Sequence, residues 1–202
     1  MQLVAPNVPL MIAGFTAALI ITTLVHELGH LTAARLLRIP VRRVAVGMGP
    51  IFWRRSLNAD SEFVLRAIPT GMSIGVPGRR NPDGTQRRPI HHDVLMAAAG
   101  PIMSLLLAAF LWGAAQTSLF PTWMQLWLAS TALLSAFLGI ANLLPVPGLD
   151  GGHLLLLGAA GLGLQLSPEH EMQAHQIGVR VVAVACLAAL LVTLVLRFFG
   201  FA

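Results

Sequence analysis

Long runs without any charged residue dominate this chain. Residues 2–25, 94–149 and 181–196 contain no Asp, Glu, Lys or Arg. A helix of about 20 apolar residues is long enough to cross the hydrocarbon core of a bilayer. The pattern therefore predicts an α-helical multi-pass membrane protein with about four transmembrane helices, placed near residues 9–37, 92–113, 122–144 and 177–199.

The polar region 40–91 interrupts this pattern between the first and second predicted spans. Its segments 41–46 and 62–68 alternate apolar and polar residues, which is the period-two pattern of strands. Gly and Pro punctuate the remainder, which is typical of turns and loops. We expect a small membrane-associated β-sheet followed by a loop, within one domain that covers residues 1–202.

Composition agrees with a membrane location, and the placement of the arginines argues against a nucleic-acid-binding function. Apolar residues make up 56% of the chain and charged residues only 10%, against about 25% in ordinary soluble domains. The formal net charge is +5, but the arginines flank apolar spans and do not line one soluble face. The lone Cys186 cannot form an internal disulfide. Because most of the chain is apolar, the lipid bilayer is its first expected partner.

Arginine asymmetry predicts how the chain is oriented. Cytoplasmic loops of membrane proteins carry an excess of Lys and Arg. Region 40–91 contains nine arginines, whereas residues 1–8 and the connection 116–121 contain none. We therefore expect a cell-membrane protein whose N-terminus lies outside, with the polar ends of its spans near the cytoplasmic face.

The sequence His26-Glu27-Leu28-Gly29-His30 lies in the second half of the first predicted span. Spacing of four residues places both imidazoles on one helix face, about 6 Å apart along the axis. Such an H-E-x-x-H helix supplies two zinc ligands and a glutamate general base. Ionisable residues in a membrane helix are costly and mark functional sites, so a metal site is the stronger interpretation over a chance match.

A third protein ligand is expected, and Asp150 is the best candidate. It follows a run of more than fifty uncharged residues and stands in a segment where Pro145 and Pro147 must end the helix. Irregular backbone at membrane depth is tolerated where it is buried in protein or lines a polar cavity. The alternative is an ordinary helix-ending turn in which Asp150 serves as a cap.

Three motifs in order resemble the site-2 protease family of intramembrane zinc metalloproteases. They are His26–His30, the Gly-Pro motif at 100–104 and the segment 142–152. The resemblance implies one zinc ion held by His26, His30 and Asp150, with Glu27 as the catalytic base and Asn142 in contact with the substrate. It also implies that the substrate is a transmembrane segment of another protein. The Gly100-Pro101 pair itself is interpreted as a packing or kinking device.

One feature departs from many bacterial members of that family, which carry PDZ domains between the second and third spans. Only a short connection joins those spans here, so the chain resembles a minimal form without a PDZ domain. Gating of substrates would then fall to the membrane region or to a regulatory partner that the motifs do not identify.

A non-proteolytic function is the alternative: a metal transporter, or a scaffold that retains the fold. A transporter normally places ionisable groups along a path across the bilayer. Here the ionisable residues are expected at one depth in the bilayer. A scaffold without activity would be expected to lack Glu27 or one of the candidate ligands, and all of them are present. The pattern favours a protease, and an exposed strand of the sheet expected within residues 41–68 is predicted to pair with the unwound substrate.

Overall fold

The computed structural model describes residues 8–79, 81, 85–164, 167, 169–170, 172–174, 176–182 and 184. It contains two compact units, Met1–Asn142 and Leu143–Ala202, which we describe separately. The first unit contains the helices and strands α1 (Val8–Leu36), β1 (Arg43–Asn58), β2 (Ser61–Gly75), α2 (Ile90–Ala115) and α3 (Thr122–Asn142). The second contains α4 (Asp150–Gly161).

Three of the described helices are long and apolar enough to cross a membrane, namely α1, α2 and α3. They match the predicted spans 9–37, 92–113 and 122–144 closely. Large apolar side chains such as Phe110 and Phe137 are about two-thirds exposed or more on these helices, a surface that lipid would cover. The fourth predicted span, 177–199, lies mostly outside the described residues, so the count of four helices stays a prediction.

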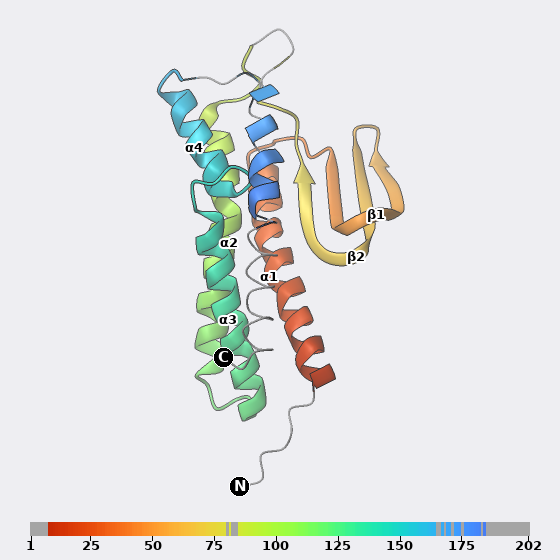
Figure 1. The fold of residues 1–202 in the computed structure, drawn as a ribbon, viewed down its shortest axis with the longest axis vertical. Helices are drawn as coiled ribbons and strands as arrows, with labels where there is room; N and C mark the ends of the chain where they lie inside the picture. Colours follow the sequence, from red (N-terminus) through yellow and green to blue (C-terminus); the bar gives the residue numbers. More distant parts are fainter. Residues whose placement is uncertain are drawn as a thin grey trace. The chain divides into compact units, whose positions relative to one another are not determined.

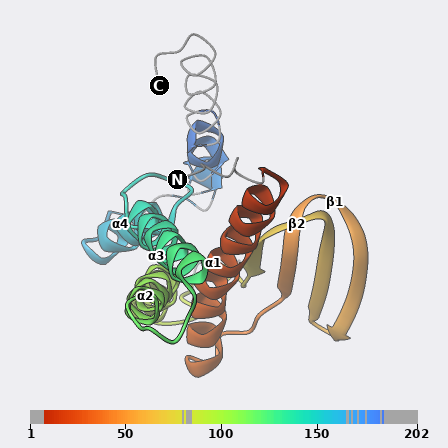
Figure 2. The ribbon, with the colours of Figure 1, turned by 90° about the horizontal axis from the view of Figure 1, so that it is seen from below.

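Helices α1, α2 and α3 lie side by side, and the sheet lies beside α1 on the side away from α2 and α3 (Figures 1 and 2). Small residues and buried polar bonds hold the helices together. A Cβ added to Gly29 of α1 would clash with the carbonyl oxygen of Ala99 on α2. The indole Nε1 of Trp127 on α3 donates to the carbonyl of Gly14 on α1 at 3.0 Å. In lipid the hydrophobic effect does not favour association of helices, so close backbone packing and hydrogen bonds must stabilise their contact.

The sheet is mixed and larger than the sequence pattern predicted. The strands extend to residues 58 and 75, beyond the predicted segments 41–46 and 62–68. Residues 43–46 of β1 pair with both 62–65 and 72–75 of β2, whereas 51–58 pair only with 61–66. Gly47 and Gly49 have φ of +95° and +84°, a conformation that favours glycine. These glycines bend β1 without ending it. Glycine is typical of turns, so the sequence pattern predicted a loop where the strand in fact continues.

A buried ion pair at the start of α2 connects this helix to the segment that follows β2. The Arg88 guanidinium donates from Nε to Asp93 Oδ1 at 2.7 Å and from Nη1 to the carbonyl of Pro77 at 2.9 Å. The Asp93 side chain is 2% exposed. Because breaking a buried pair leaves one charge uncompensated, this contact fixes the connection that follows β2.

Candidate metal centre

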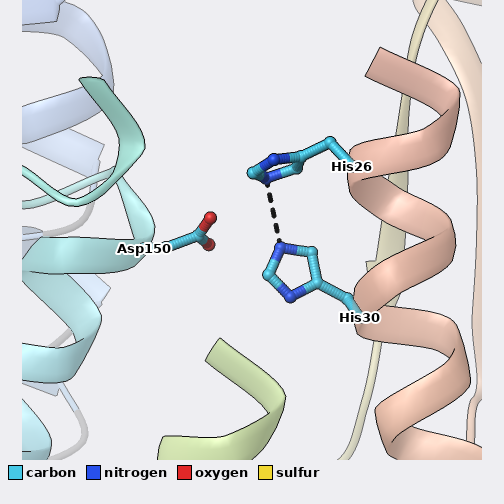
Figure 3. A group of neighbouring side chains, drawn as sticks. All are labelled: His26, His30 and Asp150. Atoms are coloured by element: carbon cyan, nitrogen blue, oxygen red, sulfur yellow. Dashed lines mark hydrogen bonds between the residues drawn. The ribbon is translucent and has the colours of Figure 1, made fainter. Parts of the chain in front are cut away.

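Helix α1 brings His26 and His30 together on one face. Their rings are 5.0 Å apart between centroids and nearly perpendicular. The two Nε2 atoms are 3.3 Å apart (Figure 3). His26 is buried. The spacing of four residues therefore gives two nitrogen atoms that converge on one point, as a shared metal ion requires.

Two groups of helix α2 lie within hydrogen-bond distance of the other ring nitrogen, Nδ1, of the two histidines. The carbonyl of Met96 lies 2.7 Å from His30 Nδ1, and Ser104 Oγ lies 2.9 Å from His26 Nδ1. A carbonyl can only accept, so His30 Nδ1 carries the hydrogen. The neutral ring then keeps its lone pair on Nε2, which is the nitrogen that faces His26.

Gly100 of α2 lies opposite both Nε2 atoms. A Cβ at this position would touch His30 Nε2 and would lie 2.8 Å from His26 Nε2. Pro101 beside it is buried within α2. The sequence interpretation of this pair as a packing device is thus incomplete, because the missing side chain also leaves open the place where the ligand nitrogens converge.

Asp150 is the first residue of α4, in the second unit. Leu149 occupies the N-cap position, and Asp150 is the acidic residue in the first turn of the helix. The preceding loop folds back tightly on the helix start: a Cβ at Gly151 would clash with the carbonyl of Leu143, and one at Gly152 with that of Val146. The two glycines after Asp150 are therefore explained by close backbone packing at the start of α4.

In the first unit His26 and His30 offer two ligand nitrogens (Figure 3), and in the second unit Asp150 offers a carboxylate. Two imidazoles and one carboxylate are a ligand set that zinc binds in catalytic sites, where a fourth position stays open. Glu27 follows His26 on α1 and is partly buried. Asn142 ends α3, and its Nδ2 donates to the carbonyl of Leu138 at 2.9 Å.

Comparisons with known proteins agree with a helical membrane protein that carries such a site. The model of Peptidase family M50 matches residues 14–125 and 114–189, and the chain belongs to this family. It is 36% identical over 103 residues to the "Putative zinc metalloprotease all3971" of Nostoc sp., covering 47% of this chain and 28% of that protein.

Two further similar proteins come from a bacterium, matched by sequence, and from an archaeon, matched by fold. The regulator of sigma-E protease RseP of Escherichia coli is 30% identical over 108 residues, covering 49% of this chain and 24% of RseP. The solved structure of the site-2 protease from Methanocaldococcus jannaschii shares the fold with a TM-score of 0.51 at 20% identity, covering 91% of this chain and 68% of that one. The chain spans about a quarter of the length of the curated relatives it matches first.

Proposed function

We propose that this chain is a zinc metalloendopeptidase that cleaves transmembrane segments of other membrane proteins, and that residues 1–202 act as one protease domain. The observation that carries the proposal is the convergence of His26 and His30 on one point, 3.3 Å apart at Nε2, within a helix apolar enough to span a bilayer. Membership of a peptidase family supports it and disfavours the alternative of a metal transporter or scaffold.

The residues present fit one zinc ion. Both imidazoles offer Nε2 toward one point, Gly100 places no side chain there, and Asp150 would add a carboxylate oxygen. Bound zinc would polarise the scissile carbonyl and make a water molecule acidic enough to attack near neutral pH.

The side chains of this chain would handle the proton and the substrate. Glu27 would accept the proton of the attacking water and deliver it to the leaving amine. A transmembrane helix hides its peptide groups in internal hydrogen bonds, so the substrate must unwind locally before cleavage. The Asn142 amide keeps a carbonyl oxygen and a second N–H that could bind the exposed peptide groups.

Replacing Asp150 with alanine should lower zinc content sharply and abolish cleavage, because two protein ligands hold the ion more weakly than three. Zinc would be measured by atomic absorption on purified protein, and cleavage on a model transmembrane substrate. Asn142→Ala is the matched control: it should slow cleavage while zinc stays bound. Full zinc occupancy in Asp150→Ala would show that the third ligand is another residue.

We place the N-terminus outside the cell membrane and region 40–91 at the cytoplasmic face. The support is the charge asymmetry: eight of the nine region arginines lie in described residues, and three of them, Arg43, Arg54 and Arg55, are exposed on the sheet. Single cysteines at Pro6 and Arg79, in a chain with Cys186 replaced by serine, should react with a membrane-impermeant thiol reagent from opposite sides. Labelling of both from the same side would contradict this orientation.

The free edge of the sheet at residues 72–75 is proposed to receive the unwound substrate as an added strand. This segment pairs only with 43–46 among the described strands, and β2 packs against α1, the helix of the histidines. Adding a strand at an exposed edge gives affinity through main-chain hydrogen bonds and leaves specificity to side-chain pockets.

Proline cannot donate a main-chain hydrogen bond. Successive N–H groups of an edge strand point to opposite sides, so only one of residues 72 and 73 offers its N–H to an added strand. We therefore expect one of the two variants, Met72→Pro or Ser73→Pro, to slow cleavage without loss of zinc. Phe52→Pro, on the opposite outer strand, is the control and should leave the rate near that of the unaltered chain. Equal losses at both edges would indicate damage to the sheet and not to substrate pairing.

A further inference from the structure

The bond between His26 Nδ1 and Ser104 Oγ joins two groups that are both buried. The atoms are 2.9 Å apart, Ser104 is fully buried and His26 is 8% exposed. Buried polar groups that lack a partner are costly, so this hydroxyl sits where the ring requires one. It lies 78 residues from His26 along the chain, on the helix that also supplies the partner of His30.

Helix α3 in turn holds the part of α2 that carries this serine. Ser135 is fully buried, and its hydroxyl donates to the carbonyl of Ser104 at 2.8 Å. A Cβ at Gly139 of α3 would lie 3.0 Å from Ser104 Cβ, so the two helices are in close contact here. The Ser104 side chain therefore has little room to turn away from His26.

We propose that Ser104 is a positioning residue for the metal centre. Its hydroxyl oxygen accepts the hydrogen of His26 Nδ1, which keeps the lone pair of the ring on Nε2 and holds that atom toward His30 Nε2. The carbonyl of Met96 does the same for His30. His26 is paired with Ser104 and His30 with Met96, so the partners follow each other in opposite order along α1 and α2, as in antiparallel helices. Helix α2 therefore orients both rings.

This inference rests on the proposed zinc site. Partners of metal-bound histidines fix the tautomer and ring orientation, and their loss typically costs about 10- to 100-fold in metal affinity. Full-length zinc-loaded protein in detergent would be titrated with a chromophoric chelator to measure zinc affinity in Ser104→Ala, Ser135→Ala and His26→Ala. We expect about 10- to 100-fold weaker binding in Ser104→Ala and a much smaller loss in Ser135→Ala, which removes an equally buried hydroxyl but leaves the bond to His26 and the close contact of Gly139 with Ser104 in place.

Unchanged zinc affinity in Ser104→Ala, with weak binding in His26→Ala, would overturn the role of Ser104 and leave the zinc site intact. An equal loss in Ser104→Ala and Ser135→Ala would also overturn it, since helix packing would then explain both. Unchanged affinity in His26→Ala would overturn the ligand assignment itself, and the positioning role with it.

Discussion

Replacing Glu27 with glutamine is expected to slow peptide-bond cleavage by about 10²- to 10⁴-fold, the usual contribution of a general base. The amide has nearly the same shape as the carboxylate but cannot accept the proton of the attacking water. Zinc should stay bound, because Glu27 is not among the candidate ligands. The measurement is the initial rate of cleavage of a transmembrane substrate beside the zinc content of the same sample.

Glu169→Gln makes the same chemical change on an exposed residue of the second unit and should leave the rate unaltered. A Glu27→Gln protein that loses its zinc would assign this residue to the ligand set. One that keeps both its zinc and more than about a tenth of the cleavage rate would mean that another group moves the proton.

Gly100→Ala is expected to weaken zinc binding by at least about tenfold, the loss typical when groups that orient metal ligands are disturbed, and to reduce cleavage accordingly. The added methyl group would press on the Nε2 atoms of His26 and His30. The rings must then turn away from each other, and they would lose their partners Ser104 and Met96 on α2.

Gly113→Ala provides a control on the same helix, because a Cβ there meets nothing within 4 Å. Both changes replace glycine by a better helix former, worth about 1 kcal/mol per residue in a helix interior, so helix propensity alone predicts similar stabilisation. Loss of zinc in Gly100→Ala only would locate the effect at the histidine rings. Equal zinc binding in both variants would contradict the steric role of Gly100.

Local sequence determines the three described apolar helices and the arrangement of two of the three candidate metal ligands. The three described spans were predictable because uncharged apolar runs of this length need only their own backbone hydrogen bonds in a bilayer. His26 and His30 were predictable because a spacing of four residues fixes their common face on any helix. The Asp-Gly-Gly segment indicated a special turn, although its packing against the carbonyls of Leu143 and Val146 did not follow from the letters.

Tertiary structure alone decides how the sheet pairs and how the histidines are held. Bends at Gly47 and Gly49 let residues 51–58 fold back onto residues 61–66 of β2, which also pair with 43–46. Alternation cannot reveal this choice, because every pairing shows the same period of two. In the sequence, Ser104 is distinguished only as the last residue of the Gly-Pro motif, and the carbonyl of Met96 looks like any backbone group in an apolar helix. They acquire their role because α1 and α2 pack antiparallel at close range, and that contact exists between distant parts of the chain.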